Sequence, residues 1–288
     1  MGSAVATEAS RRSEPAVTDR RLPGDRDRTL VLTYHAVHPT LDVWQKQKAS
    51  DRWYAVTANQ FHQQMEYILR AGYATSLLSA FLTKQTHPKS VILTFDDGHE
   101  SNYGVALPIL QRFGLRAEFF VTVSRVGQPG FMTWEQLRRL QDAGMSVQSH
   151  GLHHRPLTDL PTDKLADELR TAKQSLEHNL SSAVKYLAIP GGFANRRIYH
   201  EALEVGHEAV CNSEPGLARP GKIIARVAVT HSTAQGEFEG LVRRKLSLLL
   251  LVSAKRKLGK AAKLFLGVQR CEALKQSRLS SATDGSDV

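Results

Sequence analysis

Short apolar runs alternate with longer helical patterns along most of this 288-residue chain, and this alternation restricts the fold more than any other feature. Several runs are apolar at nearly every position, which is typical of parallel strands covered on both faces. Strands separated by single helices indicate βα units. The sequence therefore predicts one α/β domain, barrel-like or doubly wound, over residues 29–235. The expected strands are 29–34, 91–95, 117–122, 146–149, 184–189, 209–212 and 223–229.

Glycines mark the expected ends of the helices. Gly72, Gly114, Gly144 and Gly206 each follow a helical stretch. A glycine after the last turn can take the left-handed conformation that closes a helix. Two helix starts have the capping-box spacing, a threonine followed three residues later by a glutamine, at 57–60 and 133–136. These signals fix where four helices end and where two of them begin.

The positive charge is concentrated near the C-terminus. The chain carries a net charge of +10, and residues 241–275 hold ten Lys or Arg against one acid, Glu272. Because the remainder is close to neutral, the charge pattern argues against a fold that wraps nucleic acid. Leucines between the lysines predict one or two basic amphipathic helices over 241–268. Such helices either lie on an anionic membrane surface or pack on the barrel with a solvated basic face.

The N-terminal residues and the cysteines bear on location. Residues 1–28 lack the continuous apolar stretch of a secretory signal, and Cys211 and Cys271 form no Cys-x-x-Cys pair. We therefore expect reduced thiols and a cytoplasmic protein, peripheral at the inner membrane surface if the basic segment binds it. The expected organisation is a disordered lead over 1–28, the α/β domain over 29–235, and a basic helical extension with a polar tail over 236–288.

Polar residues follow three of the expected strands at their carboxyl ends, where α/β folds place their chemistry. Two histidines four apart and a carboxylate suit Zn²⁺, Co²⁺ or another divalent transition metal, and three protein ligands leave a coordination position for water. Taken singly, these residues are explained by a polar turn or a structural histidine. Their combination favours a metal-dependent hydrolase. The residues are Asp96-Asp97 after 91–95, His150, His153 and His154 after 146–149, and Pro190-Gly191 after 184–189.

Two segments carry a resemblance to a known family. Thr94-Phe-Asp-Asp-Gly98, followed some fifty residues later by Ser149-His-Gly-Leu-His-His-Arg-Pro-Leu157, is similar to motifs of the polysaccharide deacetylase family, also called the NodB-homology domain or carbohydrate esterase family four. Tyr34-His-Ala-Val37 also resembles the first strand of many members. The resemblance covers residues 29–235. It implies a distorted (β/α) barrel of about seven units that removes N-acetyl, or in some branches O-acetyl, groups from glycans.

The resemblance also implies roles for single residues. Asp96 matches the catalytic base, and Asp97, His150 and His154 match the metal ligands; the family spacing excludes His153. Gly191, which follows Pro190, matches the residue whose backbone N–H holds the oxyanion. The final strand-then-histidine motif points to His231 as the candidate general acid, with a surface-loop histidine as the alternative. His35 is expected to line the substrate groove or to be structural.

One position departs from the family pattern. Many members carry an arginine two residues before the motif proline, where it orients the base, but this chain has Ala188 there. We therefore expect another group, such as Arg155 or Arg196, to orient Asp96, or the base to be held less firmly.

The sequence leaves three functions open. The first is a metal-dependent deacetylase of a GlcNAc-type polysaccharide or oligosaccharide, in exopolysaccharide or cell-surface glycan biosynthesis. The second is a deacylase of another small acylated substrate on the same barrel. The third is a non-catalytic protein that binds glycans.

Overall fold

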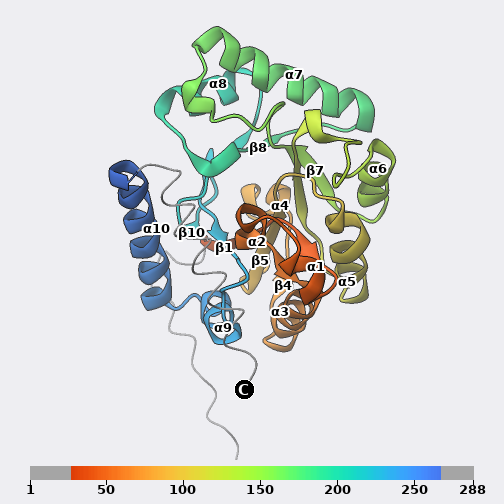
Figure 1. The fold of residues 1–288 in the computed structure, drawn as a ribbon, viewed down its shortest axis with the longest axis vertical. Helices are drawn as coiled ribbons and strands as arrows, with labels where there is room; N and C mark the ends of the chain where they lie inside the picture. The colour runs from red at the N-terminus through yellow and green to blue at the C-terminus, as the bar shows by residue number, and fades with distance from the viewer. Residues whose placement is uncertain (1–26, 267–288) are drawn as a thin grey trace, which may run out of the picture.

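The computed structural model describes residues 27–266, without the side chains of 49–50 and 259–266. The expected disordered lead falls almost entirely outside the described residues, and so does the polar tail after residue 266. A ten-stranded, mostly parallel sheet with helices packed around it forms the body of the protein (Figure 1). Its strands are β1 (Thr29–Tyr34), β4 (Ala74–Thr75), β5 (Ser90–Phe95), β6 (Glu118–Val121), β7 (Ser146–Ser149), β8 (Tyr186–Ala188), β9 (Ala209–Cys211), β10 (Leu217–Ala218), β11 (Ile223–Ile224) and β12 (Val227–Ala228).

Six of the seven expected strands agree with the structure to within about two residues at each end. The four glycines expected after helices all have positive φ angles, from 63° to 97°. Both expected capping boxes are formed. The helices are α1 (Leu41–Gln45), α2 (Ala49–Tyr54), α3 (Ala58–Arg70), α4 (Leu78–Leu82), α5 (Leu107–Arg112), α6 (Trp134–Asp142), α7 (Thr162–Leu180), α8 (Arg196–Glu204), α9 (Gln235–Val242) and α10 (Leu246–Leu266). A small second sheet pairs β2 (Val37–His38) with β3 (Val56–Thr57).

Residues 223–229 differ from expectation, because they form two short strands instead of one. The first, β11, pairs with β9, whereas the second, β12, pairs with β1 at the opposite edge of the sheet. Ala225 and Arg226 form the step between them. A single straight strand cannot pair with both edges, so the break lets this segment bring them together. The sheet order β1-β5-β6-β7-β8-β9-β11 therefore becomes a nearly closed barrel, as expected.

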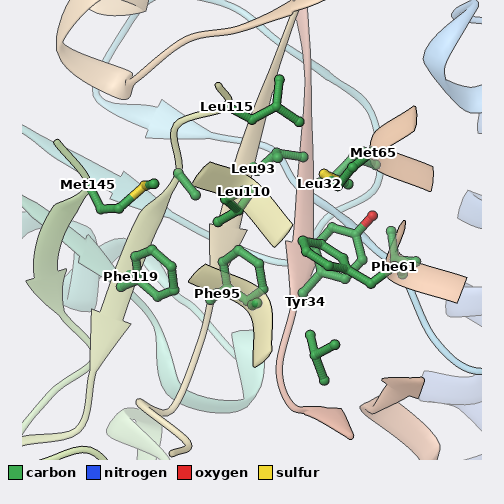
Figure 2. Packing of buried hydrophobic residues seen from close by; sticks show 14 of the residues in the cluster. Leu32, Tyr34, Phe61, Met65, Leu93, Phe95, Leu110, Leu115, Phe119 and Met145 are labelled. Atoms are coloured by element: carbon green, nitrogen blue, oxygen red, sulfur yellow. The ribbon is translucent and has the colours of Figure 1, made fainter. Parts of the chain in front are cut away.

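Alternation along the strands divides the core into an inner and an outer layer. On β1, β5 and β6 one set of side chains packs outward against α3 and α5, and Tyr34, Phe95 and Phe119 stack in this layer (Figure 2). The other set points into the barrel, where Phe120 and Ile92 lie with Leu78 and Phe81 of α4. Because β4 pairs with the start of β5, α4 lies at the amino end of the barrel. The carboxyl end is left for the functional residues.

The C-terminal helices pack on the barrel. α9 places Phe238, Leu241 and Val242 in the outer layer of the core, and Leu249 of α10 joins them. No helix within residues 27–266 has both the length and the apolar character that crossing a bilayer requires.

Glu118 lies inside the barrel and gives a first prediction. It is fully buried, and its Oε1 accepts a hydrogen bond from the Leu78 backbone N–H at 2.7 Å. Burial raises the pKa of Glu118 from 4.5 to about 7, although hydrogen bonds from Ser146 and Leu78 oppose the rise. The folded state thus holds a proton that the unfolded state has already released, so folding stability falls as pH rises from about 4.5 to 7.

The variant Glu118→Gln, which is neutral in both states, is expected to remove this loss. Relative to the wild type it should gain up to about 3 kcal/mol of unfolding free energy above pH 7, and nothing at pH 4. Urea unfolding of both proteins at pH 4, 6 and 8 measures the difference. A difference that stays constant across this range would contradict a buried carboxyl with a raised pKa.

Candidate active site and metal centre

Alternation at the end of β5 sends the two adjacent aspartates in different directions. Ile92 and Thr94 point into the barrel, so Asp96, two residues further on, also lies on the inner side. Asp97 has a φ of 73°, which ends the strand and turns its side chain away from that of Asp96. A non-glycine residue in this left-handed region costs about 1–3 kcal/mol, and such strain is concentrated at functional sites. His154 has a φ of 57° as well.

Asp97, His150 and His154 converge at the carboxyl ends of β5 and β7. Asp97 Oδ1 lies 2.9 Å from His154 Nε2 and 3.5 Å from His150 Nε2. The three ligand atoms all lie within 4.8 Å of one another, and this is the only group of three such side chains found among the described residues. Two imidazoles and a carboxylate form a donor set that divalent transition metals prefer.

The barrel fixes His150 for metal binding. Its Nδ1 lies 2.9 Å from the Ala188 carbonyl oxygen at the end of β8, which is an acceptor only. Nδ1 must therefore carry the proton, and Nε2 presents its lone pair toward Asp97. Burial lowers the pKa of His150 to about 4, against the opposing charges of Asp96 and Asp97. The ring is consequently neutral at pH 7, as a metal ligand must be.

Asp97 provides the test of whether an ion fits here. Its Oδ1 is buried and lies within 3.5 Å of the Nε2 atoms of both histidines, and Arg125 Nη1 lies 3.6 Å from the same oxygen. Burial raises the pKa of Asp97, but the hydrogen bond from His154 and the charges of His35 and His150 outweigh burial and hold the pKa well below its usual range. A buried, ionised oxygen that faces two imidazole nitrogens fits a bound divalent cation.

Glu168 of α7, which the sequence analysis missed, holds the loop that carries His154. Its Oε1 accepts hydrogen bonds from the backbone N–H groups of Leu152 and His153, and its Oε2 lies 2.7 Å from His153 Nδ1. His153 lies outside the Asp97–His150–His154 cluster. The sequence signal was a glutamate between Leu165 and Leu169 on the buried face of a helix.

Removing this support is expected to weaken metal binding. The variant Glu168→Ala should lower Zn²⁺ affinity about 10- to 100-fold, because loss of a group that orients a ligand loop has this effect in metal sites. Competition titration against a chelating dye measures the affinity. Glu135→Ala, on the exposed face of α6, is the matched control. Equal affinities in the two variants would contradict a role for Glu168 in positioning the loop.

Arg226 orients Asp96. Its Nη1 and Nη2 donate to Asp96 Oδ1 and Oδ2 at 2.7 and 2.8 Å, and its Nε donates to the Asn212 carbonyl at 3.0 Å. The guanidinium is only 1% exposed and packs over the Phe120 ring. Burial raises the pKa of Asp96, but the Arg226 charge, followed by that of His150, outweighs it, so the pKa is lowered. Asp96 is therefore ionised at neutral pH.

This pairing corrects the expectation for Asp96. Neither Arg155 nor Arg196 provides the guanidinium; both side chains are exposed. Arg226 fills that role from the step between β11 and β12, so Ala188 does not leave the base unsupported. The sequence signal was an arginine inside the apolar run 223–229. A buried strand contains an arginine only when the charge is paired.

His35 and the Pro190-Gly191 turn border the cluster. β1 pairs with β5, and the Asp96 N–H donates to the Tyr34 carbonyl at 2.9 Å, so His35 follows β1 next to the aspartates. Its charge lowers the pKa of both Asp96 and Asp97. Gly191 has a φ of 66°, and the preceding proline lies 3.5 Å from the place where a Cβ on Gly151 would be. The turn thus lies against the residue that follows His150.

His231 lies on the other side of β1 from Asp96. β12 and β5 pair with opposite edges of β1, and His231 follows β12. Its ring stacks on Trp44 with centroids 3.9 Å apart, and its Nδ1 lies 3.2 Å from Gln60 Oε1. Burial lowers the pKa of His231. The structure does not bring it into the cluster of Asp96, Asp97 and the metal-site histidines.

Residues 83–210 match the model of the polysaccharide deacetylase family, and they include both aspartates, both metal-site histidines and the Pro190-Gly191 turn. This match, over 128 of the 288 residues, bears out the resemblance to the polysaccharide deacetylase family. His35 and Arg226 lie outside the matched region, which explains why a motif comparison alone does not locate the partner of Asp96.

The curated relatives to which this chain is similar come from bacteria. It is 26% identical over 193 residues to YxkH of Bacillus subtilis (65% of each chain). It is 30% identical over 139 residues to the peptidoglycan-N-acetylmuramic acid deacetylase PdaA of the same organism (46% of this chain, 49% of PdaA). It is 26% identical over 160 residues to the poly-beta-1,6-N-acetyl-D-glucosamine N-deacetylase of Staphylococcus aureus (49% and 55%). The chain thus spans between about half and about two thirds of these relatives.

Solved structures of deacetylases share the fold. IcaB from Ammonifex degensii superimposes with a TM-score of 0.64 at 25% identity, covering 75% of this chain and 96% of IcaB. The Streptococcus pyogenes deacetylase PplD, solved in complex with acetate, gives a TM-score of 0.66 at 24% identity, covering 75% and 97%. These likenesses agree with the barrel expected for the deacetylase family.

Proposed function

We propose that this protein is a metal-dependent hydrolase that removes N-acetyl groups from a GlcNAc-type polysaccharide or oligosaccharide. The observation that carries the proposal is the pair of adjacent aspartates with separate environments. Asp96 is held ionised by Arg226, and Asp97 lies within 3.5 Å of two imidazole nitrogens. The Asp96 carboxylate is therefore available as a base, while the Asp97 carboxylate would bind the metal ion.

The chain's own residues supply most of the chemistry. Zn²⁺ is the proposed ion, with Co²⁺ as an alternative, and when bound it acts as a Lewis acid on the acetyl carbonyl and lowers the pKa of water. Asp96 takes a proton from the attacking water. The Gly191 backbone N–H donates a hydrogen bond to the oxygen on which negative charge develops, and one such donor contributes about 3 kcal/mol. The products are acetate and a free sugar amine.

The departing amine needs a proton donor, and His35 has the better position. It lies beside Asp96 and Asp97, whereas His231 is on the far side of β1 and packs on Trp44. Imidazole can donate and regain a proton near neutral pH. We therefore expect His35→Gln to lower kcat about 10²- to 10⁴-fold and His231→Gln to lower it far less. Steady-state acetate release measures both; a larger loss in His231→Gln would restore the assignment made from the sequence motif.

The similarity to relatives supports the choice of sugar. The Staphylococcus aureus relative is named for poly-beta-1,6-N-acetyl-D-glucosamine and PdaA for N-acetylmuramic acid. We propose the GlcNAc polymer as substrate, exopolysaccharide or cell-surface glycan biosynthesis as the setting, and the cytoplasmic side of the membrane as the location. The third possibility from the sequence, a non-catalytic glycan-binding protein, depended on poor alignment of the base, and the Arg226–Asp96 pair argues against it.

Acetate release tests the proposal. Purified protein is incubated with β-1,6-linked GlcNAc oligosaccharides, with peptidoglycan fragments containing N-acetylmuramic acid, and with small N-acetylated amines, each with and without a chelator. We expect release from the GlcNAc oligosaccharides that the chelator abolishes and added Zn²⁺ or Co²⁺ restores. Release from muramic acid fragments alone would transfer the proposal to that sugar. Acetate release from the small N-acetylated amines alone would favour a deacylase of another small acylated substrate. Glycan binding without acetate release would favour a non-catalytic glycan-binding protein.

A further inference from the structure

Helix α10 has one face that belongs to the barrel. Leu249 is buried in the outer core layer, and Leu248 and Val252 are half-buried against the same cluster. Further along the helix, Ser253 Oγ donates to the Pro215 carbonyl at 3.2 Å. These contacts fix the orientation of α10 at the edge of the molecule, beside α9 (Figure 1). The helix therefore presents a defined outer face.

The outer face of α10 is apolar. Leu246, Leu250, Leu251 and Leu258 are 69%, 60%, 46% and 71% exposed. They make up four of the nine large apolar side chains that are exposed in the described part of the chain. Three of them follow a spacing of four or eight residues, so they line up along one side of the helix. A soluble surface rarely groups apolar side chains in this way unless it has a partner.

Basic side chains flank the leucines. Lys245, Lys255 and Lys257 are exposed, and Lys255 Nζ lies 3.9 Å from Glu237 Oε1. The sequence contains no aspartate or glutamate between residues 241 and 266. The outer face of α10 thus combines leucines with positive charge and no negative charge of its own.

We propose that the outer face of α10 binds an anionic lipid surface. Amphipathic helices with leucines on one side and lysines beside them lie in the headgroup region, where the leucines reach the acyl boundary and the lysines meet phosphate. A second copy of this chain fits less well, because pairing the two faces would bring their lysines together. Nucleic acid would satisfy the lysines but leave the leucines in water.

The same helix reaches the catalytic region. Arg256 Nε lies 4.0 Å from Glu214 Oε1, and Arg256 Nη2 lies 3.2 Å from the place where a Cβ on Gly192 would be. Gly192 follows Gly191 of the proposed oxyanion turn. A lipid surface bound by α10 is therefore held beside the turn that borders the active site, which suits a substrate presented at a membrane.

Vesicle co-sedimentation of the full chain tests the proposal. We expect the wild type to sediment with vesicles of phosphatidylcholine and phosphatidylglycerol at low salt, but not with phosphatidylcholine alone. Raising the salt to about 0.5 M should release most of it, since screening weakens charge attraction. The triple variant Leu250→Gln/Leu258→Gln/Lys257→Glu should lose binding at least tenfold. The matched control is Leu69→Gln/Lys164→Glu, which makes similar changes on α3 and α7 and should bind as the wild type does.

Each other outcome overturns the proposal. Equal sedimentation of the triple variant and the control would show that α10 is not the contact. Equal binding to both kinds of vesicle would remove the anionic requirement. If sedimentation velocity shows a dimer for the wild type and a monomer for the triple variant, the outer face of α10 is an interface between copies of this chain. If the wild type binds a DNA duplex and the triple variant does not, the face binds nucleic acid. Circular dichroism melting checks that both variants fold. Because sedimentation measures binding directly, the result does not depend on deacetylase activity.

Discussion

Replacement of Asp96 by asparagine is expected to lower kcat for acetate release by about 10²- to 10⁴-fold, the range that general bases contribute. Asparagine keeps the size of the side chain and one oxygen for Arg226, but it cannot take a proton from water. The three metal-site side chains are unchanged, so metal content should stay close to that of the wild type. Acetate release and elemental analysis of the same preparation measure the two quantities.

His150→Ala is the control for Asp96→Asn. It removes a metal ligand that is buried and held by the Ala188 carbonyl, so both metal content and turnover should fall. If Asp96→Asn lost the metal as well, the two aspartates would not have separate roles. If it kept full activity, the base would be a different group.

The fold could be predicted from the sequence because its signals are local. Apolar runs, glycine at helix ends and the two Thr-x-x-Gln starts each depend on a few neighbouring residues, and apart from the run 223–229 they appear in the structure as expected. The expected metal cluster followed for the same reason. Asp97 and His150 come within two residues of a strand end, and His154 follows in the loop after His150; parallel strands bring their carboxyl ends to one side of a barrel.

Arg226 could not be placed from the sequence, because its role depends on barrel closure. It is 130 residues from Asp96, and it reaches the base only because residues 223–229 break into β11 and β12. The apolar run predicted one strand, and one strand would have left Arg226 as an anomaly in a buried sheet. His231 stays a prediction from the motif. The motif pointed to it, but the strand order puts β1 between it and Asp96.

Replacement of Arg226 by methionine is expected to cost about 3–5 kcal/mol of folding stability, because it leaves the Asp96 carboxylate buried without its partner. Burial then dominates, so the pKa of Asp96 rises. The acidic limb of the kcat/KM profile should move to higher pH, and activity at pH 7 should fall sharply while metal content is retained. Urea unfolding, pH-rate profiles and elemental analysis measure the three effects. Arg226→Lys keeps the charge but loses the two parallel hydrogen bonds, so it should lie between the wild type and Arg226→Met.

The double variant Arg226→Met/Asp96→Asn separates the two roles of the pair. With no buried charge left, it should recover much of the stability that Arg226→Met loses, yet it should remain inactive because the base is gone. A purely structural arginine would instead give stability losses that add and a pH profile that does not move. A shifted pH profile together with rescued stability would establish that Arg226, from the step between β11 and β12, keeps Asp96 ionised and oriented toward the substrate. Arg226 would then take the role of the arginine that many family members carry at the position of Ala188.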